Sequence, residues 1–319
     1  MQAVAVRAFR APPELMDLEP PAPGPGEVRV RIAAAGINPL DWKIIDGIYD
    51  GRRAHRFPLV LGIDGAGWVE SRGPNVERFQ DGDPIFGQFL HDPVGDGTFA
   101  ELSITPEAIG VTRFPADLGP VSAAALPTAG MTALDALDQL GIGLGSSLLI
   151  AGASGGVGSF AIQMAKARGV RTVALARPGA EGRLRQLGAS DVLEYGSVTL
   201  DDQIRALFPS GVDALLDAAS RAPEFARLSH YVRPRGRAMS TAYAADSSSA
   251  PGDGVERINY GLEPTAALLE RVVREVVGHH LEVPVEREVR LSDVPGALAE
   301  SRAGLAKGKT VVRVADRAT

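Results

Sequence analysis

The sequence contains no cysteine. This absence excludes disulfide bonds and removes every thiolate that a structural or catalytic zinc site could use. The five histidines cannot rebuild a Cys/His site, and the adjacent pair His279-His280 has the wrong spacing for one helical face. We therefore expect no metal site, and we interpret all five as structural or surface residues: His55, His91, His230, His279 and His280.

Long apolar runs and dense clusters of basic residues are also missing. No uninterrupted apolar stretch approaches the roughly 20 residues that cross a bilayer, and the start of the chain lacks the pattern of a secretory signal. The net charge is -6 with a pI near 5.5, and no Lys/Arg run is dense enough to follow the phosphates of a nucleic acid. We expect a cytoplasmic protein with neither a membrane nor a nucleic-acid partner.

The chain's length and composition are those of an ordinary globular protein. It has 319 residues, of which 45% are hydrophobic and 23% charged. At roughly 100 to 200 residues per domain, this length predicts about two domains.

The pattern of predicted elements changes near residue 121. Before it, short strands alternate with turns, as in residues 27–32 after the Pro/Gly-rich residues 20–26. After it, a helix over 123–140 precedes a buried strand over 147–151 and a helix to 169, a succession typical of a parallel sheet covered on both faces. Further strands are predicted over 171–176, 191–193, 213–216 and 237–241. The tail, with helices over 264–277 and 295–306 and strands over 285–291 and 310–314, could join either part.

The strongest local signal is an apolar strand that runs into a glycine-rich turn and then a helix, residues 148–158. It fits the dinucleotide fingerprint with Ala153 in the first glycine position, followed by Gly155 and Gly158. Gly155 would let the backbone approach a pyrophosphate, and Gly158 would let the helix pack closely. Such clusters can be plain turns, but strand, turn, helix and second strand occur here in order. The predicted phosphate contacts are Ser154, Gly155, Gly156, Val157 and Gly158.

The end of the second strand indicates which dinucleotide binds. Enzymes that use NAD usually carry Asp or Glu there, whereas this strand ends in Arg177. An arginine can grip a 2′-phosphate, with Arg183 and Tyr195 as further contacts, so NADPH is favoured over NADH. The alternative is that Arg177 and Arg183 are solvated residues at a helix entry.

Several separated segments resemble one family. They are residues 23–28, 36–43, 61–67, 97–101, 126–133, 153–158 and 308–309. In these segments the sequence resembles the zinc-free quinone oxidoreductase (zeta-crystallin-like) branch of the medium-chain dehydrogenase/reductase superfamily. The resemblance implies an α/β fold, with a GroES-like catalytic domain over 1–120 completed by 262–319, and a Rossmann NADPH-binding domain over 121–261. It also implies a homodimer.

The chain departs from the zinc-dependent relatives at their metal ligands. Those relatives place a cysteine in the segment matching residues 36–41 and a His-Glu pair in the segment matching 62–65. Here the equivalent residues are Asn38-Pro39 and Ile63-Asp64. We expect Asp41 and Asp64 to hold turns or loops by hydrogen bonds.

Without a metal, simple alcohol oxidation becomes harder, but a conjugated acceptor needs less help because hydride addition spreads charge into an enolate or phenolate. Candidate hydrogen-bond donors, by resemblance, are Asn38, Lys43, Tyr49 and Thr132. Lys43 favours small enones, since many quinone reductases carry tyrosine there. Lys43 and Tyr49 could instead be partly buried amphipathic side chains, with water supplying the final proton.

The resemblance also extends the nucleotide groove beyond the glycine-rich turn. It implicates Ser220, Ser240, Thr241, Ala242, Asn259 and Tyr260, which could equally be turn and strand-edge residues. The predicted function is zinc-independent, NADPH-dependent reduction of quinones or α,β-unsaturated carbonyls. A specialised enoyl or keto reductase of a biosynthetic pathway and a non-catalytic NADPH-binding protein remain open.

Overall fold

The computed structural model describes residues 1–245, 252–306 and 308–314. The chain forms two compact units. The first comprises Met1–Met131, Pro264–Arg274 and Val283–Thr319, and the second comprises Thr132–Glu263 and Glu275–Glu282. The chain passes between the units four times: within α3 (Pro127–Leu140), between residues 263 and 264, within α8 (Ala266–Gly278), and between residues 282 and 283.

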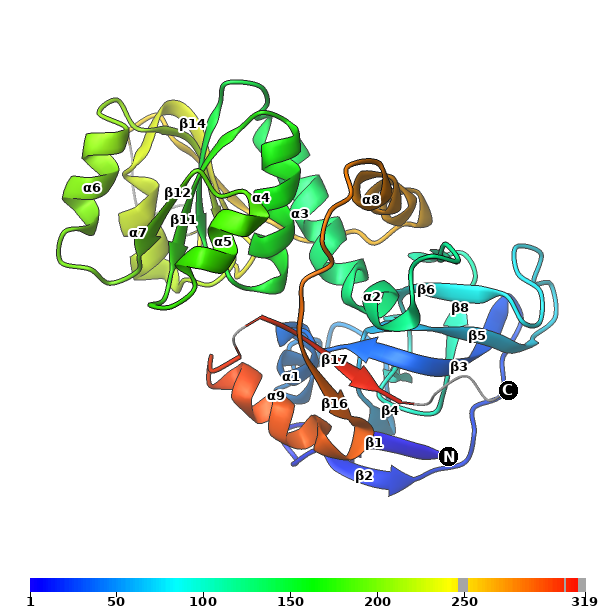
Figure 1. The fold of residues 1–319 in the computed structure, drawn as a ribbon. Coiled ribbons are helices and arrows are strands. Elements are labelled where there is room, and N and C mark those ends of the chain that lie inside the picture. The colour runs from blue at the N-terminus through cyan, green and yellow to red at the C-terminus, as the bar shows by residue number, and fades with distance from the viewer. Residues whose placement is uncertain (246–251, 307, 315–319) are drawn as a thin grey trace. The chain divides into compact units, whose positions relative to one another are not determined.

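The first unit contains two β-sheets (Figure 1). The larger has the strand order β16-β17-β3-β5-β6-β9, with β8 also paired to β3, and the smaller has the order β2-β1-β4-β7. The strands are β1 (Gln2–Val6), β2 (Glu14–Asp17), β3 (Glu27–Gly36), β4 (His55–Val60), β5 (Asp64–Arg72), β6 (Pro84–Gln88), β7 (Val94–Asp96), β8 (Leu102–Pro106), β9 (Val111–Arg113), β16 (Val285–Arg290) and β17 (Lys309–Arg313). The helices that belong wholly to this unit are α1 (Pro39–Ile45), α2 (Pro120–Ala125) and α9 (Val294–Arg302).

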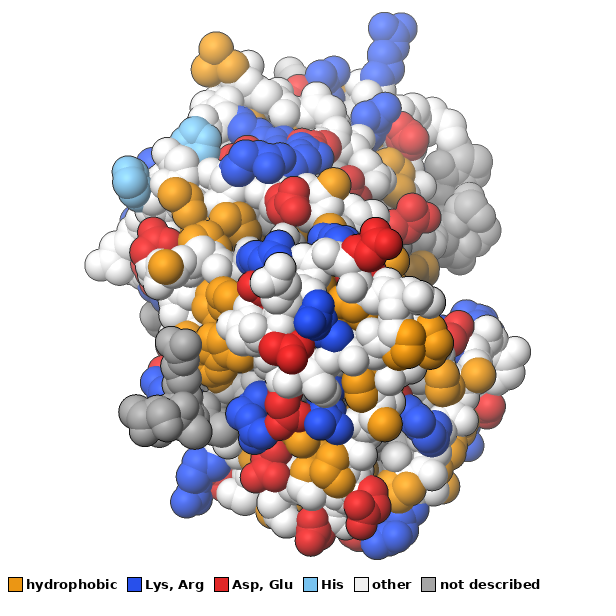
Figure 2. All heavy atoms as spheres, turned by 90° about the vertical axis from the view of Figure 1, so that its right-hand side faces the viewer, with side chains coloured by type: hydrophobic (Ala, Val, Ile, Leu, Met, Phe, Trp, Pro, Cys, Tyr) orange, Lys and Arg blue, Asp and Glu red, His pale blue; other side chains and the backbone are white. Residues whose placement is uncertain are grey.

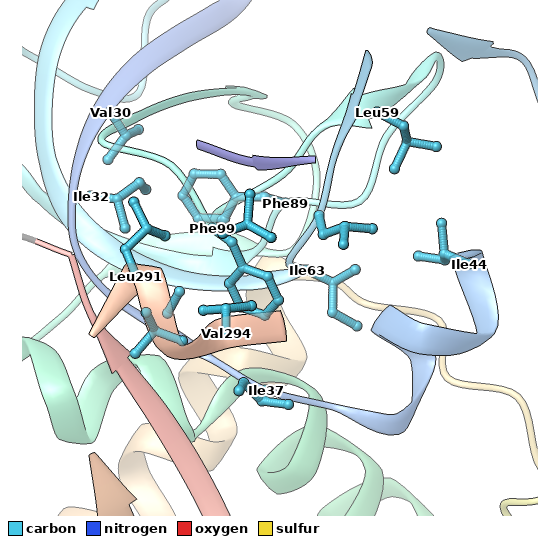
Figure 3. Close-up of a cluster of buried hydrophobic side chains, with 14 of the residues drawn as sticks. Val30, Ile32, Ile37, Ile44, Leu59, Ile63, Phe89, Phe99, Leu291 and Val294 are labelled. Carbon is cyan, nitrogen blue, oxygen red and sulfur yellow. The ribbon is translucent and has the colours of Figure 1, made fainter. Parts of the chain in front are cut away.

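The core of the first unit joins segments from both ends of the chain (Figure 3). Ile32, Leu59 and Phe99 are each at most 1% exposed, and they share one cluster with Leu291 and Val294 from the tail. Burial of apolar surface contributes about 25 cal/mol per Å², so these contacts fix the tail on the first unit. The sequence pattern alone leaves that choice open, and the strand pairing of β17 with β3 settles it.

The second unit is a six-stranded parallel sheet in the order β12-β11-β10-β13-β14-β15, the doubly wound order of dinucleotide-binding folds. Helices α4 to α7 flank it (Figure 1). The strands are β10 (Ser147–Ala151), β11 (Arg171–Ala176), β12 (Asp191–Glu194), β13 (Val212–Asp217), β14 (Val232–Ser240) and β15 (Glu256–Asn259). The helices are α4 (Gly156–Ala167), α5 (Glu181–Leu187), α6 (Leu200–Leu207) and α7 (Ala222–Ser229). The predicted α/β fold, with a β-rich unit and a doubly wound unit, is confirmed.

One predicted helix differs from the structure. The single helix expected over 123–140 is divided into α2 and α3 at Leu126-Pro127, because proline has no backbone N–H to continue the hydrogen bonds of the first helix. Helix α2 packs on β3, β5 and β17, so the first unit extends to Met131 rather than ending near residue 120.

The surface carries charges of both signs. Figure 2 shows acidic and basic side chains interleaved on the face drawn. Across the chain, ion pairs between such side chains are common, such as Arg171 with Asp191 at 2.9 Å. Within the described ranges, no helix combines the length and apolar character needed to cross a bilayer.

Candidate functional site

The glycine-rich turn joins β10 to α4 through a close backbone approach. Gly152 has a φ of +76°, which favours glycine, and the Gly155 N–H donates to the Gly152 carbonyl at 3.0 Å. A Cβ atom on Gly158 would lie 2.5 Å from the Gly152 oxygen and 2.6 Å from Ala153 Cα. Only glycine therefore lets the first turn of α4 pack against the residues before it. The turn and the first residues of α4, residues 154–158, could therefore hold an anion at the N-terminus of the helix.

An adjoining turn is held by an aspartate that the sequence analysis did not identify. Asp217, at the end of β13, is fully buried, and its Oδ1 accepts the N–H groups of Ala219 and Ser220 at 2.9 and 2.8 Å. Its Oδ2 has no hydrogen-bond partner among the described residues. Asp217 thus fixes the backbone that carries Ser220. An aspartate followed by small residues after a buried strand is the signal that could have revealed this turn.

The ends of β11 and β12 bring Arg177 and Tyr195 to one edge of the sheet. Ala176 is paired with Glu194 in the parallel register, and the Tyr195 N–H donates to the Ala176 carbonyl at 2.8 Å. Arg177 is exposed directly after β11, whereas Arg183 is half-buried in α5. Partial burial, and after it the nearby Glu224, raise the pKa of Tyr195, so its phenol keeps its proton and can donate.

Polar side chains at the ends of β14 and β15 hold a loop. The Ser240 hydroxyl accepts the N–H groups of Ala242 and Ala244 at 3.2 and 3.1 Å. Asn259 bonds Ala245 in both directions, accepting at 2.9 Å and donating at 2.7 Å. Within this loop the Thr241 N–H donates to the carbonyl of Asp217 at 2.9 Å. The loop that carries Thr241 and Ala242 is therefore fixed from both strands.

Thr132 and Tyr260 are joined in the second unit. The Tyr260 hydroxyl donates to Asp135 Oδ2 at 2.9 Å and is also hydrogen-bonded to the Thr132 side chain. Burial, and then Asp135, raise the pKa of Tyr260. Both side chains are at most 5% exposed, so this network fixes the part of α3 that holds Thr132.

The other catalytic candidates lie on and around α1 in the first unit. Lys43 is half-buried in the last turn of the helix, where burial lowers its pKa, and its Nζ lies 5.7 Å from the centroid of the Trp42 ring. Tyr49 follows α1 and packs against the core, with the Arg53 guanidinium 5.3 Å from the centre of its ring. Asn38 directly precedes α1. The structure thus places Asn38, Lys43 and Tyr49 on one short segment.

Asn38 belongs to a buried polar cluster with Asp64 and Lys309. Its Nδ2 donates to Asp64 Oδ2 at 2.8 Å and to the Gly36 carbonyl at 3.2 Å, and its Oδ1 accepts from Lys309 Nζ at 2.8 Å. Lys309 Nζ also lies 3.3 Å from Asp64 Oδ2. Sequence reasoning marked Gly308-Lys309 as part of the resemblance but gave Lys309 no role.

The same aspartate fixes the start of α3. Asp64 Oδ1 accepts the Thr128 hydroxyl at 2.6 Å and lies 3.2 Å from the Thr128 backbone nitrogen, while Gln88 Nε2 donates to the Thr128 hydroxyl at 2.8 Å. Asp64 thus holds the start of a helix by hydrogen bonds, where the sequence predicted a turn or a loop.

Asp41 is a second buried carboxyl in this region. Its Oδ2 accepts the Asn38 backbone N–H at 2.7 Å, so it holds the entry to α1 as expected. Its Oδ1 has no hydrogen-bond partner within the described part of the chain. Complete burial, together with the charge of Asp64, raises its pKa to about 8, although the Asn38 N–H and Lys309 act in the opposite direction.

The metal-ligating residue types do not gather in the part of the chain that the structure describes. No group of three His, Cys, Asp or Glu side chains there is arranged to hold a metal ion. His91 is buried, with Nε2 3.2 Å from the Ile104 carbonyl, and His279 lies on the surface, 3.6 Å from Glu275.

Comparisons with known proteins show which family the chain resembles. Residues 24–116 match the alcohol dehydrogenase GroES-like domain, and residues 156–258 match the family described as zinc-binding dehydrogenase. The chain is 30% identical over 308 residues to the chloroplast envelope quinone oxidoreductase homolog of Arabidopsis thaliana, covering 92% of this chain and 91% of that protein.

Solved structures agree on the fold over nearly the whole chain. A quinone oxidoreductase from Pseudomonas syringae pv. Tomato DC3000 has a TM-score of 0.86 at 26% identity, covering 98% of this chain and 99% of its own. A protein described as an NAD-dependent alcohol dehydrogenase has a TM-score of 0.87 at 28% identity, covering 99% and 100%. Together these similarities show that the chain belongs to the quinone oxidoreductases of the medium-chain dehydrogenase/reductase superfamily, a superfamily of nicotinamide-dependent oxidoreductases.

Proposed function

We propose that the protein is a zinc-independent, NADPH-dependent reductase of quinones or α,β-unsaturated carbonyl compounds. One observation carries the proposal. In the segments where zinc-dependent relatives hold their metal ligands, this chain has Asn38 and Asp64, and a buried lysine ammonium lies against both side chains. A cation already present between these groups opposes the binding of a second one.

The residues of the second unit fit a phosphate-bearing dinucleotide. The absence of a Cβ at Gly158 allows the close turn that exposes the start of α4 to the pyrophosphate. Arg177 and Tyr195, at the ends of neighbouring strands, would grip the 2′-phosphate, with Arg183 beside them on α5. Ser220, Ser240, Thr241, Ala242, Asn259 and Tyr260 would line the rest of the groove.

When bound, the dihydronicotinamide supplies a hydride. The protein must then stabilise negative charge on the acceptor's oxygen, which a quinone or enone spreads over its conjugated system. We assign this role to hydrogen-bond donors among Asn38, Lys43, Tyr49 and Thr132. Burial lowers the pKa of Lys43, which makes its ammonium a better proton donor than an exposed lysine.

The deciding experiment measures NADPH and NADH consumption with quinones, 2-alkenals, cyclic enones, saturated ketones and alcohols, with and without EDTA. We expect NADPH-dependent reduction of conjugated acceptors that is insensitive to EDTA. Because one structural relative is described as NAD-dependent, both cofactors are compared under the same conditions. Alcohol oxidation that EDTA abolishes would refute the proposal.

The panel also separates the alternatives. Turnover confined to enoyl thioesters or ketones would indicate a specialised reductase, and tight NADPH binding without turnover on any acceptor would indicate a binding protein. A cytoplasmic homodimer remains our prediction for the assembly, and light scattering after size exclusion tests the dimer.

A further inference from the structure

The strand register brings Lys309 to the candidate catalytic segment. In the larger sheet of the first unit, Gly36 is paired with Asp64, and Asp64 is paired with Gln88. On the other side of β3, Gly36 is paired with Val311, two residues after Lys309. The start of β17, the end of β3 and the start of β5 therefore meet at one place. A residue separated from Asn38 by 271 positions in the chain becomes its direct neighbour.

Lys309 is enclosed there rather than extended into solvent. Its side chain is 3% exposed and that of Asp64 is 0% exposed. A Cβ atom on Gly36 would lie 3.0 Å from Lys309 Cε and Nζ, and 2.4 Å from the Ala124 carbonyl, so a glycine is required where the lysine crosses the end of β3. Burying two charges is costly, and the protein retains them only with close pairing and hydrogen bonds.

The contacts fix which way the Asn38 amide faces. Its oxygen accepts from the Lys309 ammonium at 2.8 Å, and its nitrogen donates to the Asp64 carboxylate at 2.8 Å. A flipped amide would set its NH₂ group against the ammonium and its oxygen against the carboxylate, and both contacts would be repulsive. The remaining amide hydrogen is donated to the Gly36 carbonyl, with a longer nitrogen–oxygen distance of 3.2 Å. This is the weakest of the three hydrogen bonds, so it is the one that Asn38 can most easily exchange for a bond to another acceptor.

We propose that Lys309 is a positioning residue for Asn38: its ammonium is a built-in cation that holds the Asn38 amide in one orientation, with Asp64 as counter-ion. This inference rests on the proposed function, since it assumes that Asn38 donates to the acceptor's oxygen. The lysine acts through Asn38 and does not itself touch the acceptor.

The first test compares K309M with the double variant K309M/D64N. The single change leaves the Asp64 carboxylate buried without a counter-charge, whereas the double variant removes both charges and keeps an acceptor for the Asn38 amide. We expect kcat of the double variant to fall roughly 10- to 100-fold, the range for partners that orient a catalytic group, with KM for NADPH and acceptor within threefold of wild type. The control is K166M, which removes an exposed lysine near the end of α4 and should leave kcat unchanged.

The cysteine-free sequence permits a chemical rescue. In K309C the new thiol is the only one in the chain. Alkylation with 2-bromoethylamine in denaturant, followed by refolding, restores an ammonium at nearly the length of lysine, whereas iodoacetamide adds a neutral amide. We expect at least tenfold recovery of kcat with the aminoethyl group and none with the carbamidomethyl group. Refolded wild-type protein treated with each reagent controls for the procedure.

Two results would overturn the inference: a double variant whose kcat stays within threefold of wild type, or equal recovery with both alkylating reagents.

If the wild-type protein reduces no acceptor, the proposed function fails and a measurement without turnover decides the role of Lys309. In urea unfolding, K309M and N38A should not act independently, so the unfolding constant of their double variant should rise by less than the product of the two single-variant changes. Multiplicative effects would refute the pairing.

Discussion

Asp41 is a residue whose protonation should affect the folding equilibrium. Its pKa in the folded protein is about 8, against an ordinary value of 3.8, so between these values the native state holds a proton that the unfolded chain releases. Stability from this group is fully present below pH 3.8, is lost progressively as pH rises from there, and is gone once pH passes the folded pKa of about 8. We expect D41N to flatten the dependence of the unfolding free energy on pH between about 5 and 7, by up to about 1.4 kcal/mol per pH unit.

The measurement is urea unfolding at several pH values, and the control is D50N, which alters an exposed aspartate after α1. The amide of D41N retains an oxygen that can accept the Asn38 N–H, so the change removes the titration while keeping this hydrogen bond. An unchanged slope in D41N would show that Asp41 is already ionised in the folded protein at neutral pH.

Arg177 should determine the choice between the two nicotinamide cofactors. Removing a charge-assisted hydrogen bond costs roughly 1.5 to 3 kcal/mol, so R177Q should lower the preference for NADPH over NADH roughly ten- to a hundredfold. The measurement is the ratio of kcat/KM for the two cofactors. R287Q, which removes an exposed arginine from the first unit, is the matched control. An equal ratio in R177Q and wild type would place the 2′-phosphate elsewhere.

The sequence allows the roles of some single residues to be predicted, but not those of others. Gly155, Gly158 and Arg177 stand at fixed offsets within one strand-turn-helix-strand stretch, so local spacing is enough to nominate them. Lys309 could not be assigned in this way, because its contact with Asn38 depends on the pairing of β17 with β3. The turn at Asp217 could have been suspected from an aspartate followed by small residues after a buried strand, but the hydrogen bonds of its carboxylate to Ala219 and Ser220 are seen only in the structure.

At the scale of elements, alanine substitutions at two glycines around the start of α4 should have different effects. In G158A the added Cβ meets backbone atoms at 2.5 and 2.6 Å, so the turn must shift, and we expect a loss of about 1 to 3 kcal/mol in stability along with weaker NADPH binding. In G155A the added Cβ lies 3.3 Å from the Gly152 carbonyl oxygen, so a much smaller shift is needed and stability should fall less than in G158A. Because Gly155 is proposed to face the pyrophosphate, its substitution should still weaken binding.

Thermal unfolding and fluorescence titration with NADPH measure the two effects separately. If G155A bound NADPH as tightly as wild type, the proposed approach of the pyrophosphate to this residue would be wrong. If G158A kept wild-type stability, the close packing of α4 on the turn would not be what requires a glycine there.

Elements with strong periodicity were predictable. The bounds of β10 and β11 are those predicted, because both are short apolar runs between clear turn signals. Strand β14 begins at Val232, earlier than the predicted residue 237, because it continues through Pro234 and through Arg235 at a φ of 69°, neither of which is typical of a strand. The short β15 (Glu256–Asn259) was not predicted, since its polar sequence carries no strand pattern.

At the scale of the molecule, both units are assembled from distant parts of the chain. The tail returns to the first unit through β16 and β17. Residues 275–282 belong to the second unit, where Gln163 bonds Glu282 in both directions, at 2.9 and 2.8 Å. Each unit therefore includes a segment from late in the chain. The order of elements along the chain does not show which unit such a segment joins, so the sequence pattern could not place the tail.

This organisation makes ligand effects on unfolding specific to one unit. A ligand that binds only the native state stabilises it by about 2.7 kcal/mol at a free concentration of 100 times its Kd. All the proposed phosphate contacts lie in the second unit, so calorimetry with NADPH should raise the transition of that unit, and the rise should be lost in G158A. EDTA should leave both transitions in place, because the Lys309 ammonium, 3.3 Å from Asp64 Oδ2, is the proposed counter-charge in the first unit. A lowered transition in EDTA that zinc restores would show that the first unit depends on a metal after all.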